Sequence, residues 1–239
     1  MKRNFVSALA LLLLSTLSVG SAAVQFNRPP PGRVDRVQEV YFHGHNKNGR
    51  YIAVSSRRLL ARPRPPVVVY QPYLTVYLQN PSSNVARPIY QSPGDSIGLI
   101  PQVRQLRRFP MVFMPAASMQ ILGVGDFAAN GRQELVVGVH TSAADCGMVD
   151  IHVLSLSARN KVTNMLQLQN YCRLSAAIAR GRYLVLSGPY YAPGAALYRP
   201  TINNARSSVA YDPKTGRWSQ HPSYFKLVQT NVSAPTHIP

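Results

Sequence analysis

The chain has 239 residues and a strongly one-sided charge, because 26 Lys and Arg residues stand against 8 Asp and Glu, giving a formal net charge of +18 at pH 7. So few acidic residues argue against a paired-carboxylate active site, which needs two acids brought together. Most of the basic residues are arginine, whose planar guanidinium donates two hydrogen bonds at once to phosphate, sulfate or carboxylate. An anionic partner and a solvated basic surface both account for this composition.

The N-terminus has the pattern of a secretory signal. Lys2 and Arg3 precede an apolar run at residues 8–14, and small residues follow up to Ala23. This order predicts a signal peptide over residues 1–23 with cleavage after Ala23. An uncleaved anchor would need about 20 apolar residues, and polar residues interrupt this run. We therefore expect a periplasmic or secreted protein with no transmembrane segment after cleavage.

The remainder divides into an arm and a β-rich domain. Residues 24–39 are polar and proline-rich, which predicts an extended arm with polyproline II geometry. Residues 40–239 contain short alternating or β-branched segments separated by Gly, Pro and Asn, a pattern typical of antiparallel strands. The clearest of these segments are residues 50–57, 66–79, 118–127, 134–142, 148–157, 161–172, 182–191 and 207–220. Helix is scarce, and residues 96–109 allow about a turn and a half before Pro101 opposes more.

A weak internal repeat links the turns of this domain. Gly followed by Arg stands immediately before an apolar segment at Gly49, Gly131, Gly181 and Gly216. Glycine supplies the positive φ that a tight hairpin turn requires, so turn chemistry alone also accounts for the repeat. The recurrence predicts an all-β fold with a propeller-like arrangement of short antiparallel sheets.

The loop at residues 126–135, DFAANGRQEL, carries the most specific motif. It resembles the FG-GAP and VCBS repeats, the calcium-loop blades of integrin-type propellers. The resemblance implies that Asp126 is the first ligand, Asn130 a later one and Glu134 the last acid. It also implies that Arg132 offers its backbone carbonyl and that Gly131 makes the sharp turn.

One departure from the motif bears on the metal. Ala128 stands where a second side-chain ligand is expected, and calcium needs six to eight oxygen ligands. Two interpretations stay open, a weak calcium site and a metal-free loop that keeps only the turn. The hairpin at residues 207–218 is similar to the closing hairpin of propeller-like periplasmic proteins, some of which are immunity proteins against cell-wall-degrading effectors.

Cys146 and Cys172 are the two cysteines of the chain. In an oxidising compartment they are most simply a disulfide. The alternative is a nucleophilic Cys146 near His140, but this stretch shows no orienting base beyond proximity along the chain. His43 and His45 have the spacing that places both side chains on one face of a strand, yet no third metal ligand lies nearby.

Arginine clusters and loop tyrosines are the candidate binding residues. Tyrosine beside arginine can stack on sugars or peptide side chains, although half-buried strand aromatics are the plainer interpretation. The candidates are Arg57, Arg58, Arg104, Arg107, Arg108, Tyr190 and Tyr191. No recognised nucleic-acid module is present, so nucleic acid is not the partner we expect.

Three functions are consistent with the sequence. The leading hypothesis is a non-catalytic binding protein for an anionic polymer, such as lipopolysaccharide or a cell-wall polymer, or for an envelope protein. The second is a hydrolase of cell-wall or surface polymers with His140, Asp145 or His152 at its centre. The third is a structural component of an envelope assembly whose arm docks on a neighbour.

Overall fold

The computed structural model describes residues 24–28, 35–44, 49–64, 67–80, 82–92, 116–141, 148–170, 174–194 and 199–228. These residues form strands and turns and contain no helix, which confirms the all-β class. In particular, they include no helix long and apolar enough to cross a membrane. The predicted signal peptide, the segment at residues 96–109 and both cysteines lie outside the described residues.

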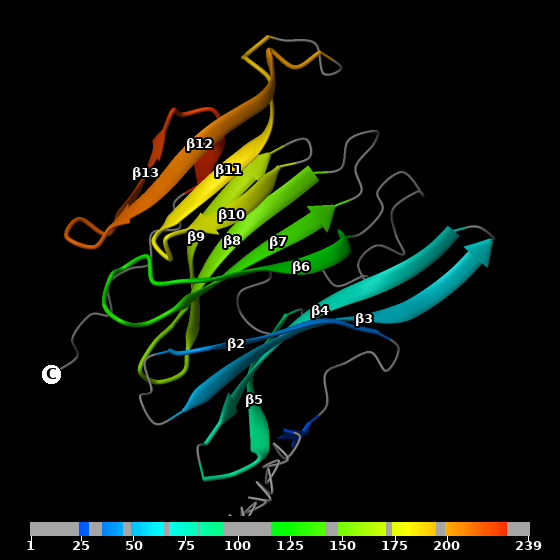
Figure 1. Ribbon diagram of the computed structural model, residues 1–239. Coiled ribbons are helices and arrows are strands. Elements are labelled where there is room, and N and C mark those ends of the chain that lie inside the picture. Colours follow the sequence, from blue (N-terminus) through cyan, green and yellow to red (C-terminus); the bar gives the residue numbers. More distant parts are fainter. Residues whose placement is uncertain are drawn as a thin grey trace, which may run out of the picture.

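Sheet A is built from the N-terminal part of the chain (Figure 1). Its core is an antiparallel meander of four consecutive strands, each hydrogen-bonded to the next. These are β2 (Asp35–Phe42), β3 (Arg50–Arg64), β4 (Val67–Gln79) and β5 (Val85–Ser92). A short strand, β1 (Gln25–Phe26), adds in parallel to the outer edge of β5.

Sheets B and C repeat the four-strand meander. Sheet B contains β6 (Ala116–Gly125), β7 (Glu134–Thr141), β8 (Met148–Leu156) and β9 (Val162–Asn170), and β14 (Lys226–Val228) adds antiparallel to β9. Sheet C contains β10 (Ser175–Ala179), β11 (Tyr183–Tyr190), β12 (Ile202–Asp212) and β13 (Arg217–His221). Within each meander, strands that are consecutive in sequence are neighbours in the sheet, as short antiparallel hairpin connections favour.

Sheet B lies between the other two and is buried on both faces. Leu135 and Val137 of β7 belong to a core cluster shared with sheet A, whereas Val136 between them belongs to a cluster shared with sheet C. The same division separates Leu154 from Val153 on β8. Burying one such side chain stabilises the fold by about 1.5–3 kcal/mol. A strand buried on both faces is apolar at nearly every position, so apolar and polar residues do not alternate strictly along β7 and β8.

The outer face of sheet A is covered by part of the expected N-terminal arm. Phe26 packs on Tyr77 with ring centroids 4.5 Å apart, and Tyr77 Oη donates to the carbonyl of Arg28 at 3.0 Å. Residues 35–39 lie within β2, and Pro29 to Pro31 lie outside the described residues.

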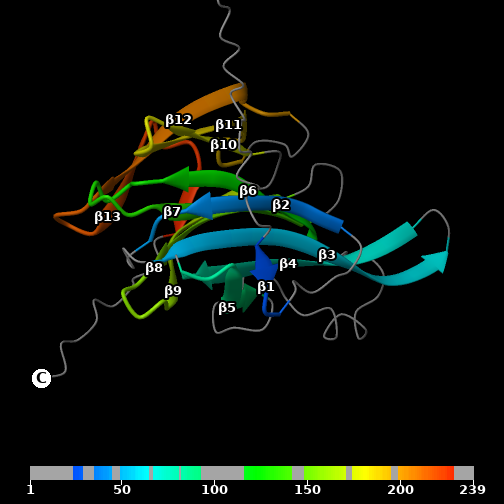
Figure 2. The ribbon, with the colours of Figure 1, turned by 60° about the horizontal axis from the view of Figure 1, so that its bottom comes forward.

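The first strands of the three meanders are neighbours in space. β6 contacts β2 on one side and β10 on the other. The three sheets diverge from these neighbouring first strands, as Figures 1 and 2 show from two directions. The turn that follows each first strand is thereby brought to the same end of the molecule.

Candidate functional site at the hairpin end

Hydrogen bonds join turns from different sheets at one end of the molecule, which we name the hairpin end. His43, after β2, accepts through its carbonyl from the Gln133 amide at 2.7 Å, and its own amide donates to Gln133 Oε1 at 2.9 Å. Tyr51 Oη donates to Asn160 Oδ1 in the β8–β9 turn at 2.6 Å. These bonds connect sheet A to sheet B at their turns.

Close backbone packing brings the β10–β11 turn to the same end. Gly125 ends β6, and a Cβ added there would come within 3.0 Å of the Gly181 carbonyl and 2.9 Å of the Phe127 ring. Only glycine allows this approach, because any side chain would collide with backbone. These contacts bring the β2–β3, β6–β7, β8–β9 and β10–β11 turns to the hairpin end, and Figure 1 shows the β12–β13 turn on the same side.

The Gly-Arg repeat has a structural counterpart at these turns. Gly131, Gly181 and Gly216 have φ values of 76°, 68° and 66°, in the left-handed region that glycine tolerates best. Gly49, Gly131 and Gly181 each stand between the first and second strands of a meander. The positive φ expected of turn glycines is thus confirmed at Gly131, Gly181 and Gly216.

The β6–β7 loop is closed by its own polar groups. Asp126 Oδ1 accepts from the Asn130 amide and Oδ2 from the Gly131 amide, both at 2.9 Å. Asn130 Oδ1 accepts from the Arg132 amide at 3.0 Å. Amide hydrogens therefore surround the carboxylate and lower the electrostatic cost of its charge.

Glu134 lies beneath this loop at the start of β7. Its side chain is 3 % exposed, and Oε2 accepts from the Phe127 amide at 3.0 Å. Burial raises the pKa of Glu134 from 4.5 to about 7, and the nearby Asp126 charge adds to the effect. This carboxyl group is therefore partly protonated near neutral pH.

An aromatic cluster anchors the loop to sheet C. Phe127 and Trp218 are almost fully buried, with ring centroids 5.5 Å apart, and Tyr211 lies 5.1 Å from Trp218. Burial, followed by the charges of Glu134 and Asp212, raises the pKa of Tyr211. Sequence patterns did not reveal this cluster, because Phe127 and Trp218 are distant along the chain.

The calcium candidates that offer side-chain oxygens accept backbone hydrogen bonds within the loop. Both oxygens of Asp126 face amide hydrogens, and Glu134 is directed to the Phe127 amide. A calcium ion needs six to eight oxygens around it, and each Asp126 oxygen keeps a second lone pair beside the one that accepts the N–H group. Within the described part of the chain, no three His, Cys, Asp or Glu residues are placed to hold a metal ion.

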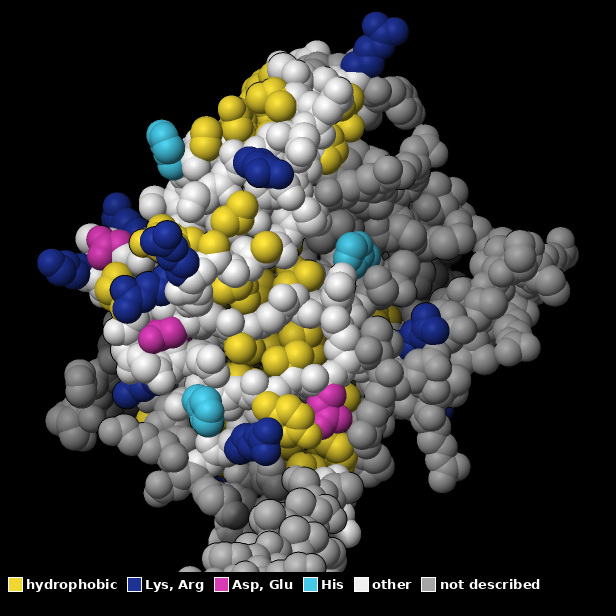
Figure 3. Space-filling view, in the orientation of Figure 1, with side chains coloured by type: hydrophobic (Ala, Val, Ile, Leu, Met, Phe, Trp, Pro, Cys, Tyr) yellow, Lys and Arg dark blue, Asp and Glu magenta, His cyan; other side chains and the backbone are white. Residues whose placement is uncertain are grey.

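Basic side chains gather at the hairpin end. Figure 3 shows Lys and Arg along the left edge of the view, over the β10–β11 and β12–β13 turns. The basic residues on or beside the turns are Arg50, Arg132, Arg159, Lys161, Arg180, Arg182, Lys214 and Arg217. The binding candidates named from the sequence include none of these eight residues, because most of them are on separate turns. The Gly-Arg repeat was the signal that could have found Arg50, Arg132 and Arg217.

The acidic residues of these turns are held by their own turns. Asp212 Oδ1 accepts from the Lys214 amide at 2.9 Å, and Oδ2 accepts from Thr215 Oγ1 at 2.8 Å. The Thr215 hydrogen bond is the main cause that lowers the pKa of Asp212. Asp126 is enclosed in the same way. The eight basic residues outnumber these two carboxylates, which leaves an excess of positive charge at this end.

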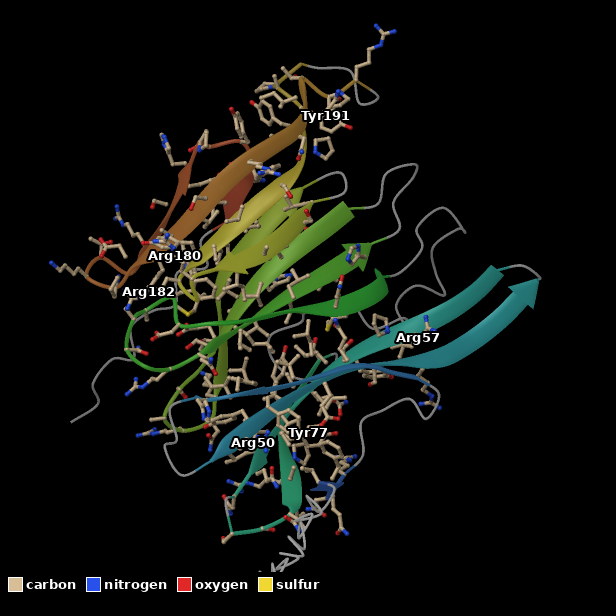
Figure 4. The ribbon with its side chains drawn as sticks, in the orientation of Figure 1. Arg50, Arg57, Tyr77, Arg180, Arg182 and Tyr191 are labelled. Atoms are coloured by element: carbon tan, nitrogen blue, oxygen red, sulfur yellow. The ribbon has the colours of Figure 1, made fainter. Side chains whose placement is uncertain are left out.

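The predicted arginine and tyrosine candidates do not form one surface. Arg57 and Arg58 lie on β3 of sheet A, whereas Tyr190 ends β11 of sheet C and Tyr191 follows it. Figure 4 shows Arg57 and Tyr191 well apart, and both lie away from Arg180 and Arg182. Tyr190 also packs on Tyr224, with ring centroids 5.1 Å apart, as a core aromatic does. Arg104, Arg107 and Arg108 lie outside the described residues.

The two histidines of the hydrolase hypothesis lie on opposite faces of sheet B. His152 pairs with Val137 and shares its face, whereas His140 is three residues along β7 and points the other way. His152 is 4 % exposed, and burial lowers its pKa to about 4. Its neutral Nδ1–H donates to the Asn164 side-chain oxygen at 3.0 Å in the amide orientation that satisfies all partners. Asp145 and His45 lie outside the described residues.

Comparison with known proteins adds no relative to this description. No protein-family model, no curated protein and no solved structure matches the chain. The function is therefore argued from the residues and from their placement in the fold.

Proposed function

We propose that this protein is a secreted or periplasmic, non-catalytic binding protein whose hairpin end binds an anionic polymer. Lipopolysaccharide and acidic cell-wall polymers have the required chemistry. The observation that carries the proposal is the gathering of eight basic side chains on five neighbouring turns, where they outnumber the carboxylates of Asp126 and Asp212. The net charge of +18 also attracts an anionic polymer from a longer distance.

The turns that carry these arginines are held by strands and by a packed core. Gly125 and Phe127 fix the β6–β7 loop against sheet C, and His43 with Gln133 fixes the neighbouring turn. Basic groups on fixed turns lose less conformational entropy on binding than groups on a mobile tail. Six of the eight are arginines, which form bidentate contacts with phosphate or sulfate.

A charge-reversal experiment tests this proposal. The double variant Arg180→Glu and Arg182→Glu is expected to weaken binding to immobilised heparin and to lipopolysaccharide by about tenfold or more at low salt. Arg206→Glu is the control, because Arg206 is exposed on the outer face of sheet C, away from the turns. Binding by the wild type should weaken steadily as salt rises.

Two results would count against the proposal. Equal losses in the Arg206 control and the double variant would show that net charge acts without a site. Salt-insensitive behaviour of the wild type towards heparin, lipopolysaccharide and DNA would remove the anionic partner altogether.

We also propose that the three meanders are blades of a propeller-type arrangement. The adjacency of β2, β6 and β10 and the equivalent position of the Gly-Arg turns support this interpretation. Propellers place short four-stranded sheets around a central axis. An experimental structure of the mature chain would test it, since superposing the meanders must give rotations about one common axis. Unrelated axes would replace the propeller with a plain stack of sheets.

A further inference from the structure

Three arginines occupy equivalent positions in the three sheets. Arg50, Arg132 and Arg182 each directly follow the glycine between the first and second strands of a meander. Gly131 and Gly181 share the left-handed backbone conformation, with φ values of 76° and 68°, and neither has an atom within 4 Å of an added Cβ. The repeat therefore places one arginine on each sheet near the start of the second strand: Arg50 begins β3, Arg132 lies two residues before β7 and Arg182 lies one residue before β11.

These three positions form a row. The turn carrying Arg50 is tied to the turn carrying Arg132 by the two bonds between His43 and Gln133. The turn carrying Arg132 is tied to the turn carrying Arg182 by the approach of Gly125 to Gly181. Sheet B therefore stands between Arg50 on sheet A and Arg182 on sheet C, and Figure 4 shows these two arginines well apart.

The side chains of the row differ in their exposure to solvent. Arg50 and Arg182 are exposed, and Arg132 is half-buried at the loop. The Arg50 guanidinium lies 3.9 Å from the centroid of the Tyr41 ring, a cation–π contact that restricts its orientation. Arg180 stands beside Arg182 on the same turn, as Figure 4 shows.

We propose that the row Arg50, Arg132 and Arg182 binds a linear polyanion that crosses all three sheets, with one anionic group held at each turn. This inference rests on the proposed function and specifies its ligand as a chain of phosphate or sulfate groups. A single small anion does not span the row, because donors must lie about 3 Å from the oxygens that they bind and sheet B separates Arg50 from Arg182. A chain that spans the row makes its second and third contacts intramolecularly, which multiplies the affinity.

Chain length is the variable that tests the inference. Binding of inorganic tripolyphosphate and of long-chain polyphosphate is measured by calorimetry at low salt, and heparin oligosaccharides of increasing length form a parallel sulfate arm. The variants are Arg50→Ala, Arg132→Ala and Arg182→Ala, with Arg206→Ala as the matched control outside the row. Fluorescence of Trp218, the single tryptophan, verifies that each variant is folded.

The expected result has two parts. Long-chain polyphosphate binds at least tenfold more tightly than tripolyphosphate, because only the long chain reaches three turns. Each row variant weakens long-chain binding by roughly fivefold to tenfold and tripolyphosphate binding by less, whereas Arg206→Ala leaves both within about twofold. Binding in only one of the two arms identifies phosphate or sulfate as the source of the anion and supports the row.

Other outcomes separate this inference from the proposed function. Equal affinity for short and long chains, or equal losses for all four variants, overturns the row while an anion-binding protein stands. No binding to any polyanion at low salt overturns both. Tight binding to vesicles of anionic lipid without any dependence on chain length in solution replaces the linear polymer with a membrane surface.

Discussion

Asp126 shows how one side chain closes the loop of the most specific motif. Its two carboxylate oxygens accept from the Asn130 and Gly131 amides, so the charge is stabilised within the loop. We expect Asp126→Ala to lower the free energy of unfolding by about 1–2 kcal/mol, since two amides lose their acceptor. The melting temperature of the wild type should be the same in millimolar calcium and in EDTA. A rise with calcium that Asp126→Ala abolishes would establish a metal site instead.

Glu134 and His152 give the stability opposite dependences on pH. The pKa of Glu134 is raised from 4.5 to about 7, so its contribution is complete below pH 4.5 and is lost as pH rises through 7. The pKa of His152 is lowered from 6.5 to about 4, so its contribution is present above pH 6.5 and is lost as pH falls through 4. The two slopes partly cancel between pH 4.5 and 6.5.

Replacing Glu134 separates these effects. In Glu134→Gln the amide oxygen can still accept from the Phe127 amide, but the group no longer titrates. Relative to wild type, the variant should gain stability between pH 4.5 and pH 8, by on the order of 2–3 kcal/mol at most. Urea denaturation followed by Trp218 fluorescence at several pH values measures the difference. A difference that stays constant with pH would assign an ordinary pKa to Glu134.

At the scale of elements, the turns depend on glycine for two different reasons. Gly131 needs its positive φ of 76° but has open space around it, whereas Gly125 faces the Gly181 carbonyl and the Phe127 ring at about 3 Å. Gly131→Ala should therefore cost about 1–2 kcal/mol of backbone strain. Gly125→Ala should cost more, because it separates β6 from the β10–β11 turn or displaces Phe127.

Trp218 distinguishes the two variants. It packs on Phe127, so Gly125→Ala should shift its emission in the folded state, and Gly131→Ala should leave the emission unchanged. Chemical denaturation of both variants gives the free energies for comparison. Equal losses without an emission change would mean that the backbone approach at Gly125 adds no energetic constraint.

At the scale of the whole molecule, the predicted disulfide would link two connections between strands. Cys146 falls between β7 and β8, and Cys172 falls between β9 and β10. A bridge closing this loop should stabilise the fold by about 3–4 kcal/mol in the chain-entropy model. If the bridge is present, no thiol reagent should label the protein when it is denatured without reductant. The double variant Cys146→Ser and Cys172→Ser should unfold at lower urea, and full labelling of the wild type would contradict the bridge.

Local patterns in the sequence were sufficient for the class of fold and for its turns. β-branched alternation with Gly, Pro and Asn between segments indicated strands, and Gly131, Gly181 and Gly216 have the positive φ expected of turn glycines. These features depend on neighbouring residues, whose steric limits are present in any part of the chain. The calcium-type motif was equally visible, but the bonds that fill its loop were not.

Only the tertiary structure decided which faces and turns meet. Val153 and Leu154 look alike in sequence, yet they belong to different cores because sheet B is covered on both sides. His140 and His152 are separated by the sheet, Arg57 and Tyr191 are carried apart by different sheets, and Phe127 meets Trp218. The physical reason is that strand formation is governed by local backbone preferences. The stacking of sheets, which sets the burial of Glu134 and the row of arginines, is governed by apolar burial between distant segments.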